Sequence, residues 1–228
     1  MALLAAIFAI GIARIAYDAT ISDEARIRQR LARRARVAIA EAQEGPVRLI
    51  GRVHLTGEAL IAPVSQRPCI AYQTTIRIGN NDGQWEKALG LEDLCPFVLT
   101  DETGQAVIES GAGPYSILLI PGLAASTSRF REDSAELKTA RGLLRAENID
   151  EQTFFGNNKP IQFSEAVLLP GTEVSVAGRC TREVALDGER AGYRELPQRV
   201  VVRGSADEPL LLSNWRELLE KTPTSKSR

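Results

Sequence analysis

From Val47 onward, apolar and polar residues alternate in short runs, which is typical of β-strands with one buried face. Turn residues separate these runs, and the sequences NNDG at 80–83 and DETG at 101–104 predict tight hairpins. One segment, 131–150, instead has apolar positions at helical spacing, with Asp133 or Ser134 as its N-cap. The expected strands lie within 47–55, 58–63, 69–79, 96–110, 115–122, 160–169, 172–184 and 193–204.

Two of the expected strands share the pattern V-x-[LV]-x-G-R-[VC], at 47–53 and 174–180. Gly51 and Gly178 interrupt otherwise good strand sequences, and glycine in that place indicates a bulge or sharp coiling. Small barrels need such bending. We therefore predict a mainly β (α+β) fold, a small and strongly bent β-barrel-like domain with one inserted helix, over residues 46–213.

The first 18 residues have a different character. The stretch from Met1 to Tyr17 is apolar except for Arg14, and as a helix it would rise roughly 25 Å against a hydrocarbon core of about 30 Å. Arg14 could reach the headgroups, and Tyr17 suits the interface. We interpret 1–18 as a transmembrane anchor that precedes the β domain; a cleaved signal peptide and a soluble helix are the alternatives.

A basic segment, 19–45, follows the anchor and predicts a helix from about 22 to 43. Positive charge on this side of a short anchor predicts a single-pass protein of the cell inner membrane, with the N-terminus outside and the β domain cytoplasmic. Membrane lipid is then an expected partner, and the small residues of 5–13 would allow homo-oligomers through the N-terminal helices. The membrane-proximal basic residues are Arg14, Arg26, Arg28, Arg30, Arg33, Arg34 and Arg36. At the other end, 214–228 predicts a short helix capped by Ser213 and a disordered tail.

Composition narrows the choice of function. With 28 basic and 29 acidic residues and 5% aromatics, the chain offers neither the charge nor the stacking surface typical of nucleic-acid binding. It has three scattered cysteines and a single histidine, His54, so the usual zinc patterns do not occur. We expect no cofactor, no metal and no nucleic acid, and keep an oligonucleotide-binding barrel as the weakest alternative.

Three residues remain as candidates for a functional or partner-binding role. Cys69 follows a proline at the start of a strand and is either a buried structural residue or a reactive thiol. Asp101 either stabilises its turn or acts as a carboxylate catalyst. Glu165 lies in an apolar strand, where it either pairs with an arginine such as Arg52 or Arg179 or serves a functional role.

Three blocks of the sequence resemble the GIDE family, also called the beside-a-membrane domain. The first block, 46–76, includes APVSQRPCIAY, with Pro63, Pro68, Cys69 and Tyr72 at the family's positions. The second is PFVLTDETGQAVI, which resembles a hairpin of that family. The third, IQFSEAVLLPGTEVSVAGRC, resembles its E-x-x-l-x-p-G block. The residues that match in the second and third blocks are Pro96, Phe97, Leu99, Asp101, Thr103, Gly104, Val107, Phe163, Glu165, Leu168, Pro170, Gly171, Val174, Val176 and Gly178.

The resemblance implies a β-rich module beside a membrane, as in mitochondrial RING-type ubiquitin ligases. This chain lacks the RING cysteines and histidines and a second apolar span, so ligase chemistry does not carry over. The expected function is a non-enzymatic module that docks or senses an unknown protein or ligand at the cytoplasmic membrane face. The alternative is a catalytic or accessory subunit of a ubiquitin-ligase-like or other membrane enzyme system.

Overall fold

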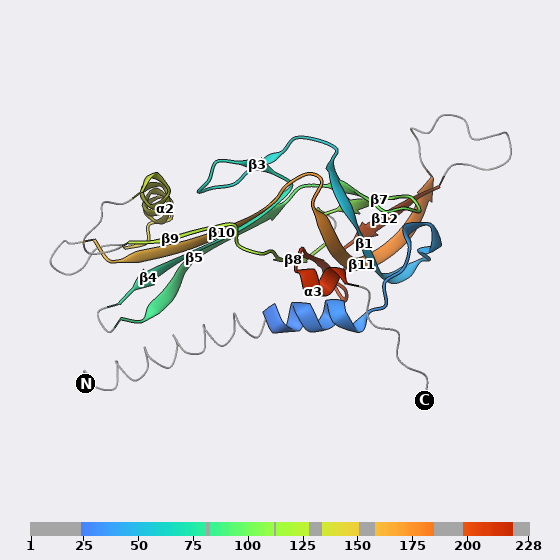
Figure 1. Cartoon of the computed structure of the whole chain (residues 1–228), viewed down its shortest axis with the longest axis horizontal. Helices are drawn as coiled ribbons and strands as arrows, with labels where there is room; N and C mark the ends of the chain where they lie inside the picture. Colours follow the sequence, from blue (N-terminus) through green and yellow to red (C-terminus); the bar gives the residue numbers. More distant parts are fainter. Residues whose placement is uncertain are drawn as a thin grey trace.

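The computed structural model describes residues 24–80, 83–111, 113–127, 134–150, 158–184 and 198–220, and they form a mainly β protein with few helices (Figure 1). Most strands belong to two sheets, one of seven strands and one of four. The strands are β1 (Gly45–Leu55), β2 (Leu60–Ile61), β3 (Pro68–Cys69), β4 (Ala71–Gly79), β5 (Trp85–Leu94), β6 (Phe97–Thr100), β7 (Gln105–Glu109), β8 (Tyr115–Leu118), β9 (Leu123–Ser126), β10 (Ile161–Leu168), β11 (Glu173–Val184), β12 (Gln198–Arg203) and β13 (Leu210–Ser213).

Part of the seven-stranded sheet closes on itself. The order β1-β6-β7-β12-β11 returns to β1 through a β1–β11 pairing, so these strands make a closed barrel, and β13 and β8 extend from β11. Neighbouring barrel strands are antiparallel except β7 and β12, which are parallel. The predicted barrel is confirmed. Closed five-stranded barrels, the OB fold among them, carry many functions, so the fold alone assigns no ligand.

The two segments with the shared glycine pattern are hydrogen-bonded neighbours in this barrel. Val47 pairs with Gly178 and Gly51 with Val174, so each pattern lies antiparallel to the other. A Cβ added at Gly51 would lie 2.5 Å from the Thr100 carbonyl oxygen, and one at Gly178 would lie 2.7 Å from the Arg203 carbonyl oxygen. Both glycines are therefore required where neighbouring strands approach closely, as the sequence predicted for a bent barrel.

The four-stranded sheet is antiparallel, in the order β5-β4-β10-β9. One face is covered by α2 (Ala135–Ala146), whose Leu137, Ala140 and Leu144 pack against Ile76 and Phe163. Ser134 caps α2 by accepting a hydrogen bond from the Leu137 N–H, as expected. A separate core, with Leu49, Phe97, Ile108 and Val202 among its residues, fills the barrel. Ala71 of β4 and Ala166 and Leu168 of β10 also belong to this second core, so the barrel core continues under one end of the four-stranded sheet.

The N-terminal helix differs from its prediction. Among the described residues it covers 24–33 and ends there instead of reaching 43, and the chain then runs on without helix to η1 (Ile39–Glu41) and into β1. The Val37 N–H donates to the Arg48 carbonyl at 3.0 Å, so this segment adds hydrogen bonds to β1 instead of continuing the helix. Within the described residues, none of the helices has both the length and the apolar character that a membrane crossing requires. The predicted anchor, 1–18, lies outside the described residues.

The last helix is also displaced. α3 (Arg216–Leu219) begins after Trp215, whose side chain makes no cap, so Ser213 does not cap it. Instead Ser213 is the last residue of β13 and accepts a hydrogen bond from the Trp215 N–H at 3.2 Å. Leu218 of α3 and Leu31 of the helix 24–33 pack with Ala177 and Leu211 of the barrel sheet. The expected disordered tail falls mostly on residues that are not described.

Candidate functional site

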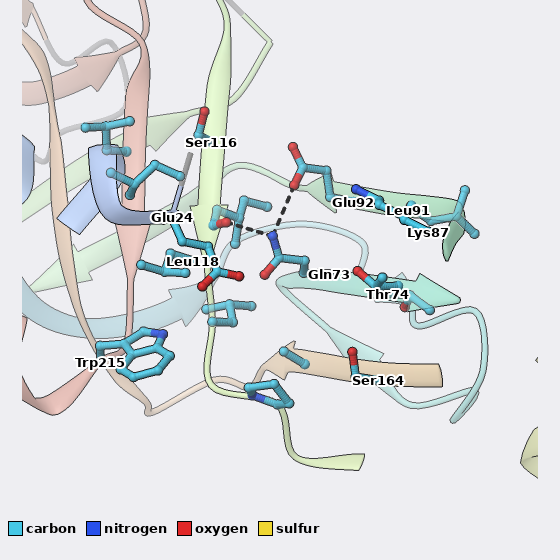
Figure 2. A pocket seen from close by; sticks show the side chains of 18 of the residues that line it. Glu24, Gln73, Thr74, Lys87, Leu91, Glu92, Ser116, Leu118, Ser164 and Trp215 are labelled. Carbon is cyan, nitrogen blue, oxygen red and sulfur yellow. Dashed lines mark hydrogen bonds between the residues drawn. The ribbon is translucent and has the colours of Figure 1, made fainter. Parts of the chain in front are cut away.

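A groove of about 820 Å³ lies between the helix 24–33 and the face of the four-stranded sheet that α2 leaves uncovered. β4, β5 and β10 line one wall, and β8 with the residues that follow it, together with Trp215, lines the other. Figure 2 shows Trp215 and Leu118 on one side of the groove and Lys87 and Leu91 on the other. Its volume lies in the range of small-molecule sites. The helix 24–33 and strands of both sheets form it together.

The two walls differ in chemistry. On the sheet wall, Gln73, Thr75 and Arg77 alternate along β4, because Thr74 and Ile76 between them are buried on the opposite side. On the wall formed by β8 and its neighbours, Pro121 and Trp215 are the apolar residues that reach the surface, and the buried side chains of Leu118, Leu119 and Leu211 lie behind it. The groove is therefore amphipathic across its width.

Basic residues outnumber acidic ones along the groove. Arg26 and Arg30 of the helix join Arg77 and Lys87 of the sheet, whereas the acidic lining residues are Glu24 and Glu92. Arg77 and Lys87 are directly opposite each other on β4 and β5, next to an irregularity in the pairing. Like charges in that position are destabilising in an antiparallel pair. Arg77 and Lys87 form a like-charge pair on the wall of the groove, and the Glu92 carboxylate interacts electrostatically with Lys87.

Glu92 and Gln73 form the polar floor between the walls. The Gln73 amide donates to the Ile117 carbonyl at 2.9 Å and to the Glu92 carboxylate at 3.5 Å, which ties β4 to β8 (Figure 2). Desolvation in the groove raises the pKa of Glu92, against weaker opposing effects of Gln73 and Lys87. The floor is held in place by these bonds before any ligand arrives.

Glu165, one of the candidates from the sequence, is 1% exposed and lies on β10. Its carboxylate accepts hydrogen bonds from the main-chain N–H groups of Val64 at 2.8 Å and Ser65 at 2.9 Å and from the Thr74 hydroxyl at 3.0 Å. The expected ion pair is not what is found, because Arg52 and Arg179 are exposed on the barrel. Glu165 instead holds the loop between β2 and β3.

Cys69 lies at the end of that loop, buried in β3 next to the Glu165 cluster. Burial, with smaller contributions from Cys95 and Glu165, raises the pKa of the Cys69 thiol to about 11. A nucleophilic cysteine needs the opposite shift. Cys69, Cys95 and Cys180 are all free thiols.

We expect Cys69 to be unreactive near neutral pH. In a Cys95→Ser, Cys180→Ser variant, iodoacetamide labelling of Cys69 followed by mass spectrometry should show a rate that rises only toward pH 11, because the buried thiol stays protonated. The neutral thiol stabilises the fold below about pH 8.5, and that contribution is lost as the pH rises through about 11. A labelling midpoint at or below pH 8 would contradict the structural role.

Asp101 lies in the turn between β6 and β7, far from the groove lining. It accepts from the N–H groups of Thr103 at 2.7 Å and Gly104 at 3.0 Å and from the Ile39 N–H of η1 at 3.0 Å. Burial opposes ionisation, but hydrogen bonds from Thr103, Ile39 and Gly104 outweigh it and hold the pKa of Asp101 below its usual value. Asp101 joins its own turn to the segment that enters the barrel.

Replacing Asp101 with alanine should lower the free energy of unfolding by about 1–3 kcal/mol, because several donors lose a charged acceptor. The neighbouring exposed Glu102→Ala is the matched control, with an expected change within about 0.5 kcal/mol. The pKa of Asp101 is lowered on folding, so its ionised form contributes stability above about pH 4 and less as the pH falls through the lowered value. Urea titrations should show the gap between wild type and Asp101→Asn constant near neutral pH and narrowing in acid; a gap that widens in acid would contradict this assignment.

The arginines of the basic segment divide into two groups. Arg26, Arg30, Arg33 and Arg36 are exposed. Arg28 stacks 3.9 Å from the centre of the Trp215 ring, and Arg34 forms an ion pair with Glu208, so these two face the fold. Of the six arginines between 26 and 36, four are therefore exposed, and the other two help to pack the helix on the barrel. Arg14 lies outside the described residues.

Arg48 is a residue that sequence reasoning missed. It is 2% exposed on β1, where its guanidinium donates to the Ser175 hydroxyl and to the carbonyls of Arg34 and Leu218. The two carbonyls lie at the C-terminal ends of the helix 24–33 and of α3, where helix dipoles favour a cation. Burial, and after it the charge of Arg36, lowers the pKa of Arg48. The sequence did contain a signal for this role, because Arg48 lies between the apolar residues Val47 and Leu49 in a predicted strand.

The residues that the structure describes do not form a metal site. His54 is exposed on β1, and among these residues no group of three or more histidine, cysteine, aspartate or glutamate side chains is placed to hold a metal. Searches with the sequence and the structure against protein-family models, curated proteins and solved structures find no significant match. The groove is therefore the best-supported binding site on geometric grounds alone.

Proposed function

We propose that this protein is a non-enzymatic binding or sensing module that residues 1–18 hold at the cytoplasmic face of a membrane. The observation that carries the proposal is the docking of the helix 24–33 on the barrel. Leu31 is buried against Ala177 and Leu211, and Arg28 stacks on Trp215. A helix fixed in this way begins only a few residues after the apolar segment in the sequence, so the groove would stay close to the bilayer.

The charges of this helix support the same proposal. Arg26, Arg30 and Arg33 are exposed, and each basic residue near an anionic surface adds about 1 kcal/mol of attraction. The resemblance to beside-a-membrane domains, stated above on three sequence blocks, is consistent with this placement. The family's markers also have structural roles here, since Cys69 and the loop 62–67 adjoin Glu165, and Asp101 orders its hairpin.

The alternative, a catalytic subunit, has weaker support. The Cys69 thiol has a raised pKa, and the carboxylates of Glu165 and Asp101 are occupied by main-chain donors. None of the three lies on the surface of the groove. An accessory role for an enzyme partner remains compatible with a docking module.

Cell fractionation tests the proposal. Full-length protein should sediment with membranes and resist extraction with alkaline carbonate, because an inserted apolar helix is not released by removing charge interactions. A variant lacking residues 1–18 should move to the soluble fraction with an unchanged circular dichroism spectrum. Full-length protein in the soluble fraction would rule out the anchor.

A further inference from the structure

We propose that the groove binds one anionic phospholipid, with its phosphate between Arg77 and Lys87 and its first acyl carbons against the apolar wall. This inference deepens the proposed function, and it rests on that function for the supply of lipid. The ligand class follows from charge and from the distribution of apolar side chains, which are taken in turn.

The first argument is the Arg77–Lys87 pair. These two residues are cross-strand partners on β4 and β5, and both line the groove. Opposite charges or neutral side chains would stabilise the sheet at this position, whereas two cations destabilise it. Local sequence choices that oppose stability are expected at functional sites. An anion placed between the two side chains would remove the repulsion.

Lys87 is also free to adjust to a ligand. Its side chain is exposed, and its Nζ lies 2.7 Å from the place where a Cβ on Gly90 would be. A glycine at 90 leaves room for the ammonium to lie over the strand, on the wall of the groove. A flexible ammonium beside a guanidinium is a suitable pair for a phosphate group.

The second argument is the amphipathic cross-section. Thr75 and Ser164 on the sheet wall supply uncharged polar groups beside the cations. Facing them, Pro121 is exposed and Ile27 and Trp215 are half-buried, and these three side chains supply the apolar surface of the groove. A free phosphate or glycerol phosphate would leave this surface uncovered, whereas a lipid has a phosphate and hydrocarbon a few ångströms apart. The complementarity favours a lipid over a water-soluble anion.

The third argument is position along the chain. Glu24, Arg26 and Ile27 line the groove, and they follow Tyr17, the end of the apolar run, by seven to ten positions. If residues 1–18 lie in a bilayer, the groove is within reach of its headgroups. Membrane lipid is then the most abundant amphiphile available to it.

Fluorescence of Trp215 gives a direct test, because this residue lines the groove and the chain has two tryptophans. In a Trp85→Phe background, full-length protein is held in phosphatidylcholine nanodiscs and titrated with dihexanoyl phosphatidylglycerol. We expect a saturable shift of Trp215 emission, and a response at least about tenfold weaker to dihexanoyl phosphatidylcholine. Glycerol phosphate and inorganic phosphate at the same concentrations should neither reproduce the shift nor compete with the lipid.

Charge variants locate the site. Arg77→Gln with Lys87→Gln should weaken the phosphatidylglycerol response at least about tenfold. Lys138→Gln with Arg179→Gln removes the same charges from exposed positions outside the groove and should leave the response unchanged. The single variant Lys87→Gln should also weaken the response, and its melting temperature is measured beside the titration, with no loss expected because the Arg77–Lys87 repulsion is removed. That combination separates lost binding from lost folding.

Each other outcome overturns the proposal. No saturable shift, an equal response to phosphatidylcholine, or a response that survives Arg77→Gln with Lys87→Gln removes the anionic-lipid site. Competition by glycerol phosphate or phosphate as strong as that of the lipid assigns the groove to a soluble anion instead. A chain that does not enter nanodiscs contradicts the proposed function, but the titration in buffer still tests the groove by itself.

Discussion

Replacing Glu165 with alanine should cost about 3–5 kcal/mol of unfolding free energy, the largest effect expected for any single residue of this protein. The carboxylate is 1% exposed and accepts from Val64, Ser65 and Thr74. Its removal leaves two main-chain N–H groups without an acceptor, one of them in a buried residue, and opens a cavity beside Cys69. The loop between β2 and β3, in which Gln66 has a φ of 55°, would lose its main attachment to the sheet. Urea unfolding followed by circular dichroism measures the loss.

Graded variants make this prediction specific. Thr74→Val removes one of the donors and should lower the unfolding free energy by about 1–2 kcal/mol. The loss for Glu165→Gln should lie between those of Thr74→Val and Glu165→Ala. Glu173→Ala, an exposed glutamate on β11, is the control, with an expected change within about 0.5 kcal/mol. If Glu165→Ala proved as stable as the control, Glu165 would not be the residue that orders the loop, and a functional role would be favoured instead.

Arg48→Met should cost about 2–4 kcal/mol and should loosen the helix 24–33 from the barrel. The methionine fills much of the same volume but leaves the carbonyls of Arg34 and Leu218 and the Ser175 hydroxyl without their donor. Both helix ends that meet at Arg48 would lose their common partner. Trp215, which Arg28 covers, should become more exposed, and trypsin should cut the segment around Arg33 and Arg36 faster.

Arg52→Met is the matched control, because Arg52 is exposed on the same strand. Arg52→Met should change the free energy of unfolding by no more than about 0.5 kcal/mol. The rate of tryptic cleavage should equal that of the wild type. An Arg48→Met protein with wild-type Trp215 emission and cleavage rate would show that Leu31 and the ion pair of Arg34 hold the helix without Arg48.

Local periodicity was enough to predict the strands of the barrel. The alternation around Gly51 and Gly178 indicated two bent strands, and the close approach of neighbouring carbonyls explains why both positions are glycine. The hairpin at 101–104 and the Ser134 cap of α2 were also predictable, because turn and cap chemistry is set by a few adjacent residues. The turn and the cap depend on contacts between residues that are close in sequence, whereas the strands could be predicted from their own alternation.

Features that depend on distant residues were missed. The helix expected to reach 43 ends at 33 because the chain beyond it bonds to β1, through Val37 and the Arg48 carbonyl. Glu165 was expected to face an arginine, but its partners are main-chain donors about a hundred positions away. The groove itself could not be predicted, because β4, β5, β8 and the helix 24–33 meet there only after both sheets have formed.

In the proposed function, each part of the chain has a separate role. The barrel is a rigid support, Arg48 and Leu31 fix the basic helix to it, and the four-stranded sheet offers a charged open wall beside that helix. The sequence blocks that resemble beside-a-membrane domains serve mainly to order loops around this support. We propose that the groove is the binding site, and the residues that give its charge lie outside those blocks.

The central claim is that the β domain lies at the cytoplasmic face of a membrane, and protease protection in spheroplasts of a bacterial host tests it most directly. A C-terminally tagged full-length protein should resist trypsin added outside intact spheroplasts and should be cut once the membrane is permeabilised. Cleavage of the β domain in intact spheroplasts, or recovery of the protein in the soluble fraction after lysis, would contradict the account.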